Sequence, residues 1–441
     1  MALGGGTFLV ENKILPGSYM NFVSVAHASA TLSDRGIATM PVNLDWGADG
    51  VTKITNEQFQ TDSQKLLGYA YTSPKLKGFR ELFANITTAY LYRLNGGGVK
   101  ASNDFATAKY SGTRGNDLKI VISKNVDKTD TWDVATYLDT ARVDLQEAVA
   151  NAAALEDNDY VVWKDSAVLV ETTIASEKSP LAGGTNTAST GNEYSEYLKT
   201  IENYNFNAMG AVVTDDITKS LFVSNVKRMR DQVGKKFQLI LYDAKSPDYE
   251  GVINVKNPVD TSTGDSEASL VWWVTGISAG CEVNKSNLNK VYDGEFTVKA
   301  DYDQDTLKEF IQDGYFALHQ VDDDIRVLED INSFVSVTDT KGDVFKDNQT
   351  IRICDQIGND IATLFNTRYL GKVPNDQSGR LTFWKDLVKY HEQLQDIRCI
   401  ENFDPKSITV EQGDSKKNVK VTDYITVINT MEKLYMTVWV A

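Results

Sequence analysis

A strand–helix–strand pattern in the middle of the chain constrains the fold more than any other feature. Residues 209–213 form a short apolar run, and apolar residues then recur at helical spacing from Ile217 to Val233. Gly234 is placed to end that helix, and residues 237–242 are again typical of a strand. Two strands joined by a helix within about 35 residues form a βαβ unit, whose strands lie parallel in one sheet. The pattern therefore predicts an α/β domain.

Other segments carry weaker patterns of the same kind. Residues 118–122, 160–163, 315–318 and 325–328 are typical of strands, and residues 137–155 and 307–311 of helices. Two long amphipathic helices are expected over 349–369 and 381–400, with these side chains inward: Ile353, Ile357, Ile361, Leu364 and Phe365 in the first; Leu381, Trp384, Val388, Leu394 and Ile397 in the second. The fold class predicted is α/β (α+β) with several domains.

Two glycine clusters, at residues 96–98 and 183–184, flank a segment of about 85 residues. A segment whose ends can meet is typical of one domain inserted into another, with few contacts crossing between them. We expect a mainly β, sandwich-like inserted domain over 97–184. The core domain is then discontinuous, over 26–96 and 185–418, with an N-terminal arm over 1–25 and a C-terminal strand and arm over 419–441.

The charge of the chain excludes two classes of partner. A formal net charge of −16 repels the phosphates of nucleic acids and the anionic surface of membranes. Residues 301–330 carry ten acidic and two basic side chains, including the run Asp322, Asp323 and Asp324. This run is either a solvated face or a docking surface for a basic patch on a neighbouring subunit. A basic cluster is expected to be the solvated face of its helix or a contact with an acidic partner: Lys227, Arg228, Arg230, Lys235 and Lys236.

The residues do not assemble into a recognisable reactive site. His27, His319 and His391 lie in unrelated contexts, and no metal-binding spacing includes them. Asp301, Asp303 and Asp305 begin like a calcium loop, but the glycine and the bidentate glutamate that such a loop needs are missing. The sequence therefore predicts no enzyme, no cofactor and no metal.

Both ends of the chain alternate apolar and polar residues, with these candidate contact residues: Phe8, Val10, Tyr19 and Phe22 in the first arm; Leu434, Met436, Val438 and Val440 in the second. A single strand cannot satisfy its own backbone N–H and C=O groups. Pairing with the sheet of another chain would satisfy them. Two such arms on a globular body predict a polymer in which each subunit donates strands to its neighbours.

The sequence also resembles a known family. The segment GGTF…NKILPGSYMNF near the start, RGIATMPVNLDWG over residues 35–47, and the glycine-flanked insertion are similar to the contractile tail sheath proteins of myovirus-type bacteriophages and of the phage-tail-like bacteriocins of Gram-positive bacteria. Ala48 and Asp49 follow Trp46-Gly47, where relatives often have proline.

The resemblance implies a sheath of stacked hexameric rings around an inner tube, contracting to drive that tube through a target envelope. Its partners would be further copies of itself, the inner tail tube protein, and baseplate and tail terminator proteins. The inserted domain would face outward, and a C-terminal helix would face the tube, with Arg380, Lys385, Lys389 and Arg398 as its charged residues. Assembly would take place in the bacterial cytoplasm, and the finished particle would be released by lysis.

Two other interpretations are open from the residues alone. One is a different self-assembling shell or filament protein, although a tube subunit would be shorter and mostly β. The other is an α/β hydrolase or a nucleotide-binding enzyme, for which the βαβ unit of residues 209–242 is the only support.

Overall fold

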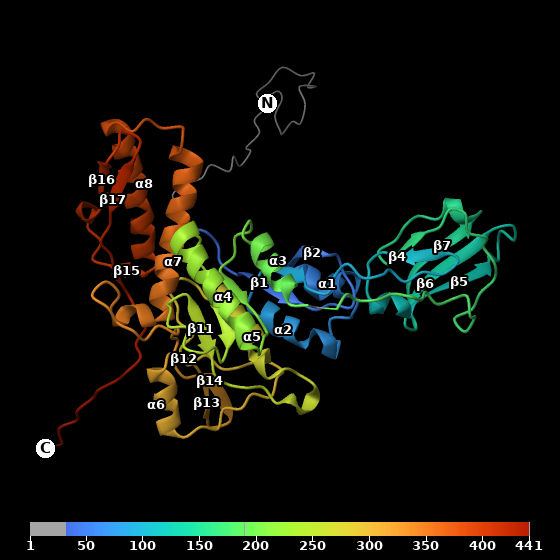
Figure 1. The fold of residues 1–441 in the computed structure, drawn as a ribbon, viewed down its shortest axis with the longest axis horizontal. Helices are drawn as coiled ribbons and strands as arrows, with labels where there is room; N and C mark the ends of the chain where they lie inside the picture. The colour runs from blue at the N-terminus through green and yellow to red at the C-terminus, as the bar shows by residue number, and fades with distance from the viewer. Residues whose placement is uncertain (1–31, 189, 441) are drawn as a thin grey trace, which may run out of the picture.

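A computed structural model describes residues 32–188 and 190–440. It has three parts (Figure 1): a central sheet with helices, the inserted domain at one end, and a helical C-terminal domain at the other. No helix within these described ranges is long and apolar enough to cross a bilayer.

The central sheet confirms the α/β prediction. Its seven strands lie in the order β12-β11-β10-β9-β1-β3-β2, and every neighbouring pair is parallel except β2 with β3. The strands are β1 (Ile37–Val42), β2 (Gly50–Thr55), β3 (Thr88–Arg93), β9 (Ala208–Gly210), β10 (Gln238–Tyr242), β11 (Val252–Val255) and β12 (Tyr315–Phe316). The predicted βαβ unit is β9, α4 (Asp216–Arg228) and β10, with Met209 opposite Leu239.

Helices cover both faces of this sheet, as a parallel sheet requires. One face carries α1 (Asn56–Leu67), α2 (Lys77–Phe83) and α5 (Val271–Gly280), and the other carries α3 (Asn192–Ile201) and α4. Alternate side chains of β10 divide between the two cores: Ile240 packs on the α5 side, and Leu239 and Leu241 pack on the α4 side. The most apolar stretch of the sequence is α5, which is buried almost all round.

The inserted domain is built of antiparallel strands. Its main sheet has the order β5 (Leu118–Lys124), β6 (Trp132–Leu138) and β7 (Ala141–Val149), and β4 (Ala106–Ala108) pairs with β8 (Val161–Trp163). The helix expected over 137–155 is wrong. Asp139 turns the chain at a φ of 56°, and register shifts along the β6–β7 pair interrupt the regular alternation, which made the apolar spacing look partly helical.

The two ends of the inserted segment meet, as the glycine clusters predict. The amide of Thr185 donates to the carbonyl of Val99, and a Cβ on Gly98 would lie only 1.9 Å from the carbonyl oxygen of Thr185. Glycine is therefore needed at residue 98.

The expectation of few contacts across this junction is wrong. Trp46 belongs to the central part by sequence, yet it is 1% exposed within the core of the inserted domain, against Tyr110 and Tyr160. From the other side, Arg114 donates to the carbonyl of Gly68 at 2.8 Å. The inserted domain is therefore packed onto the central part.

The rest of the chain forms α6 (Gln304–Gln312), the hairpin β13 (Leu318–Val321) with β14 (Asp324–Val327), and the C-terminal domain. That domain contains α7 (Asn348–Leu364), α8 (Gln377–Asp396), β15 (Ile400–Glu401) paired with β18 (Thr426–Val427), and β16 (Thr409–Gln412) paired with β17 (Val419–Thr422). Its core includes Ile353, Leu364, Val388 and Leu394, as predicted. Leu381 is 51% exposed, because it lies on the outer face of α8, one turn before the exposed Lys385.

We predict that Trp46→Ala lowers the free energy of unfolding by about 3–5 kcal/mol, because the substitution leaves a large cavity at the base of the inserted domain. Urea-induced unfolding followed by intrinsic fluorescence measures the change. Trp439→Ala is the matched control, since Trp439 is 91% exposed and its removal should leave stability unchanged. Equal effects of the two substitutions would contradict the packed junction.

Candidate assembly surfaces

An ion pair on α7 fastens the C-terminal domain to the central sheet. Arg230 follows α4, and its guanidinium donates to the Asp355 carboxylate at 2.5 and 2.7 Å and to the carbonyl of Phe237 at 2.7 Å. The two side chains are 4% and 9% exposed. Burial lowers the pKa of Arg230, but the facing carboxylate more than offsets this, so the pKa lies above its ordinary value and the cation persists.

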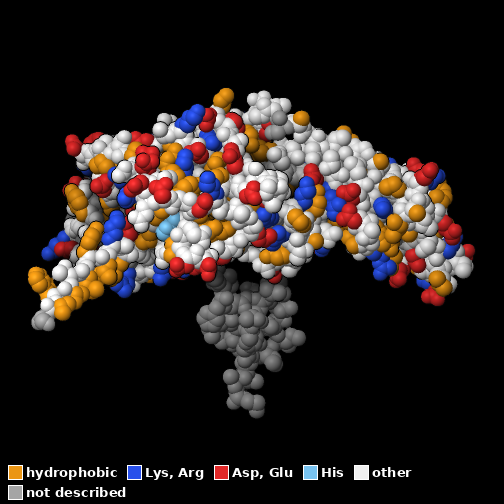
Figure 2. Space-filling view, turned by 90° about the horizontal axis from the view of Figure 1, so that it is seen from below, with side chains coloured by type: hydrophobic (Ala, Val, Ile, Leu, Met, Phe, Trp, Pro, Cys, Tyr) orange, Lys and Arg blue, Asp and Glu red, His pale blue; other side chains and the backbone are white. Residues whose placement is uncertain are grey.

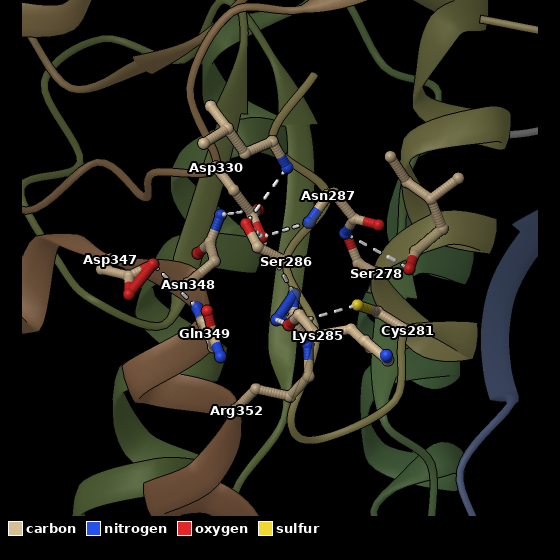
Figure 3. A network of polar contacts seen from close by, with 12 residues as sticks. Ser278, Cys281, Lys285, Ser286, Asn287, Asp330, Asp347, Asn348, Gln349 and Arg352 are labelled. Atoms are coloured by element: carbon tan, nitrogen blue, oxygen red, sulfur yellow. Dashed lines mark hydrogen bonds and ion pairs between the residues drawn. The ribbon is translucent and has the colours of Figure 1, made fainter. Parts of the chain in front are cut away.

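A second buried network surrounds Asp330, which lies in the segment between β14 and α7 (Figure 3). Its carboxylate accepts from the Asn348 amide at 3.0 Å, the Asn287 backbone N–H at 2.9 Å, the Ser286 hydroxyl at 3.2 Å and Arg352 at 3.2 Å. Asn348 also accepts from Gln238, the first residue of β10, at 2.7 Å. The first turn of α7 is thus tied to three separate segments.

The residues of the basic cluster bind carboxylate and carbonyl groups of their own chain. Arg228 pairs with Glu202, Lys235 donates to the carbonyl of Tyr204, and Lys236 donates to the carbonyl of Arg230. Lys227 donates to the carbonyl of Pro247. The expectation of a solvated helix face is wrong for Arg230, whose side chain is buried against a different domain.

The C-terminal arm is the largest exposed apolar segment among the described residues. Beyond β18 the chain leaves the body as one extended trace (Figure 1), and hydrophobic side chains line it in Figure 2. All four predicted contact residues are exposed: Leu434 by 85%, Met436 by 73%, Val438 by 68% and Val440 by 92%. No strand pairing is recorded for residues 431–440 within the described part of the chain.

The four predicted contact residues of the other arm, Phe8, Val10, Tyr19 and Phe22, lie outside the described residues. The described residues begin at Leu32, and Ser33 donates to Asp360 of α7 at 2.5 Å. Arg35 then donates to the carbonyls of Cys281 and Ser278 at 2.8 and 3.1 Å. The chain that precedes β1 therefore lies against the C-terminal domain from the first described residues.

The acidic run forms the tip of the β13–β14 hairpin. Asp322 has a φ of 51° in the turn, and Asp322 and Asp323 are exposed. Asp324 pairs with Arg326 at 2.6 Å. Other acids of the segment serve the chain itself, since Asp303 caps α6 and Asp330 is buried. The candidate acidic patch therefore includes fewer residues than the ten acidic side chains of residues 301–330 suggest.

The charged residues of the predicted tube-facing helix are divided by the structure. Lys385 and Lys389 are exposed one turn apart on α8, in line with the exposed Leu381. Arg380 is half-buried and donates to the Asn375 carbonyl at 3.0 Å, and Arg398 lies beyond the end of the helix at a φ of 62°. Only the two lysines share one open helical face.

We predict that Arg230→Met costs about 3–5 kcal/mol of unfolding free energy, because it leaves the Asp355 carboxylate buried without its partner. Lys245→Met is the control: the Lys245–Asp216 pair is 82% and 49% exposed, and breaking it should cost less than about 1 kcal/mol. Urea-induced unfolding compares the two. The double variant Arg230→Met/Asp355→Leu should recover most of the loss, and a double variant as unstable as the single one would contradict this account.

Comparison with known proteins identifies the family. Four protein-family models match consecutive parts of the chain: the tail sheath protein Gp18 domain III N-terminal region over 35–94, the phage tail sheath β-sandwich domain over 96–186, the phage tail sheath central domain over 187–333, and the phage tail sheath C-terminal domain over 340–441. The chain is 32% identical to the phage-like element PBSX protein XkdK of Bacillus subtilis, with 99% of each chain covered.

Solved structures agree. The sheath tail protein of Desulfitobacterium hafniense is 35% identical, with a TM-score of 0.80 over 95% of this chain and 99% of that one. The sheath tail protein of Listeria innocua is 30% identical, with a TM-score of 0.76 over 92% and 94% of the two chains. The helical sheath of the anti-feeding prophage in its contracted state has the same fold at 12% identity, with a TM-score of 0.58 over 96% and 98% of the two chains. The chain therefore belongs to the phage tail sheath protein family, whose members are structural proteins and not enzymes.

Proposed function

We propose that the protein is the subunit of a contractile tail sheath, which polymerises as stacked hexameric rings around an inner tube and contracts to drive that tube through a target envelope. Family membership supports the sheath role, and the likeness of fold to a sheath solved in its contracted state supports contraction. The particle would assemble in the bacterial cytoplasm and act as a virion or phage-tail-like particle after lysis.

The exposed C-terminal arm is the observation that carries this proposal. An extended, apolar segment with unpaired N–H and C=O groups fits the edge of a sheet on another copy, which would bury the side chains and satisfy the backbone. Exchange of arms also keeps neighbouring subunits linked while the rest of their contacts rearrange. If contraction uses no nucleotide, its energy must be stored in the packing of the subunits in the extended polymer. The subunits must then stay linked while that packing changes.

The further partners follow from the same role. The tail tube would meet the open face of α8 that carries Lys385 and Lys389, and the two ends of the sheath would meet baseplate and tail terminator proteins. The inserted domain would project outward from the polymer.

The hairpin tip with Asp322 and Asp323 would contact a basic surface of the next subunit. Arg230 cannot supply that surface, because it is buried in its own chain.

We predict that Met436→Pro/Val438→Pro abolishes polymerisation and leaves a folded monomer, because proline removes the N–H groups that a strand donates to its partner. Met436→Thr/Val438→Thr is the control, since threonine keeps those donors and suits a strand. Sedimentation and negative-stain microscopy detect the polymers. Tubes formed normally by the proline variant would overturn the proposed role of the arm.

We predict that Asp322→Lys/Asp323→Lys slows assembly and changes its salt dependence, while the melting temperature of the monomer stays the same. Each exposed charge pair is worth only about 0.2–1 kcal/mol, but a ring repeats the contact in every subunit. Asp127→Lys/Asp130→Lys on the inserted domain makes the same change of charge elsewhere. Equal assembly rates for the two variants, measured by light scattering, would mean that the hairpin tip is merely a solvated surface.

A further inference from the structure

The turn of the β13–β14 hairpin carries two carboxylates that its own chain does not neutralise. Asp322 and Asp323 are exposed there, and their side chains bind no cation or donor of the described residues. The next carboxylate, that of Asp324, pairs instead with Arg326 at 2.6 Å. We call Asp322 and Asp323 the acidic tip.

Two consecutive cations lie in the turn of another hairpin, β16–β17. Lys416 and Lys417 are exposed, and neither ammonium group pairs with a carboxylate in the part of the chain that the structure describes. Lys420 differs from them, because it lies opposite Glu411 in the register of the two strands. The turn therefore presents two cations that remain available to a partner.

The backbone of this turn is held in place by the connection between α7 and α8. The amide of Asn375 donates to the carbonyls of Lys416 and Asn418 at 3.0 and 2.8 Å. Arg380 of α8 in turn donates to the carbonyl of Asn375 at 3.0 Å. A fixed backbone lowers the entropy that the turn loses when a partner binds.

A third cation and two apolar side chains belong to the same surface. Lys372 is exposed, and its ammonium group donates to the carbonyl of Thr367 at 2.6 Å. Leu370 and Val373, on either side of it in the sequence, are 58% and 36% exposed. We define the basic end as Leu370, Lys372, Val373, Lys416 and Lys417.

The acids of this region leave it with an excess of positive charge. Asp376 caps α8 by accepting from the backbone N–H of Gly379 at 2.7 Å, and Asp414 is exposed in the β16–β17 turn. Counting Arg380, four cations stand against these two carboxylates. The basic end is therefore complementary in charge to the acidic tip.

The two surfaces lie at opposite ends of the molecule. Figure 1 shows the β13–β14 hairpin at the lower end of the view and the β16–β17 hairpin at the upper end. They cannot touch within one chain, so a contact between them joins two copies through different patches. Such a heterologous contact repeats from head to tail and builds a ring or a helical polymer.

The spacing of the charges favours this surface over the open face of α8. Lys416 and Lys417 are adjacent, as Asp322 and Asp323 are, and adjacent Cα atoms lie about 3.8 Å apart. Lys385 and Lys389 are one helical turn apart, which is about 6 Å along the axis. The basic end can therefore meet both carboxylates of the acidic tip at once.

We propose that the acidic tip of one copy binds the basic end of the next copy. The inference rests on the proposed sheath role, which supplies the further copies, and it deepens that role by naming the two surfaces. The lysines supply the attraction, and contact with the partner covers Leu370 and Val373.

Cross-linking of the unmodified full chain tests the contact directly. A water-soluble carbodiimide joins a carboxylate to an amine that touches it, and an equal mixture of unlabelled and nitrogen-15-labelled chains identifies links between copies. We expect mixed-isotope peptides that join residues 322–323 to residues 416–417. The exposed pair Lys308–Asp305, at 2.8 Å, is the internal control for a link within one chain. Control links without the mixed-isotope peptides would overturn the proposal.

An exchange of charges tests its chemistry. Lys416→Glu/Lys417→Glu should weaken self-association roughly tenfold in low-salt buffer, measured by sedimentation velocity, because two attractive pairs become repulsive. Adding Asp322→Lys/Asp323→Lys to the same chain should restore association to within about threefold of the unmodified protein.

A matched variant controls for net charge. Lys385→Glu/Lys389→Glu makes the same change on α8, and combining it with the reversed acidic tip should restore nothing. The proposal is overturned if the exchanged chain associates as weakly as the single reversals, or if the α8 variant restores association instead.

Tubes are scored separately, by negative-stain microscopy of the same samples. The cross-link and the charge rescue without tubes would uphold the contact and reject the sheath role, and tubes with neither would do the reverse. If a reversal variant does not fold, as judged by near-ultraviolet circular dichroism, the cross-link in the unmodified chain decides the matter alone.

Discussion

The arrangement of the C-terminal half depends on the hydrogen bonds that the buried Asp330 carboxylate accepts. It accepts from the segment after α5, from Asn348 and from Arg352, and a buried carboxylate without such donors would be costly. Because Asn348 also binds the first residue of β10, this one anion fixes the start of α7 against the central sheet. The position of α7 then decides where Asp355 meets Arg230 and where the C-terminal arm leaves the body.

Much of the fold is predictable from local patterns. The βαβ unit, the apolar faces of α7 and α8, and the glycine-flanked insertion follow from periodicity and turn residues, and the resemblance in residues 35–47 points to the correct family. The failures have local causes. A bulged strand after Asp139 imitates helical spacing, and Leu381 lies on the outer face of α8 with the exposed Lys385 and Lys389. Nothing around Trp46 in the sequence indicates that it belongs to the core of another domain.

Some features of the candidate surfaces can likewise be predicted from the sequence, and others cannot. The C-terminal arm is recognisable in the sequence because a single strand with alternating apolar residues leaves its backbone N–H and C=O groups unpaired and its apolar side chains exposed. The buried ion pairs are not recognisable: Arg230 and Asp355 are 125 residues apart, and no spacing rule connects them. Charge counting therefore predicts a solvated face or a contact with an acidic partner for Arg230, and a solvated face or a docking surface for the segment that holds Asp330. The contacts of the Gln349 side chain with residues 428 and 430 could not be predicted either, since a polar residue in the first turn of a helix is ordinary.

The junction beneath the inserted domain has a mechanical consequence. The two chain segments that cross at Gly98 and Thr185 would alone form a hinge. The burial of Trp46 in the core of the inserted domain and the hydrogen bond from Arg114 to the carbonyl of Gly68 prevent that motion. The inserted domain is then a rigid lever on the central sheet. When the central sheet rotates, the distant strands β5 to β7 move through a wider arc than the sheet itself (Figure 1). A small rotation of the core therefore produces a large displacement at the end of the inserted domain.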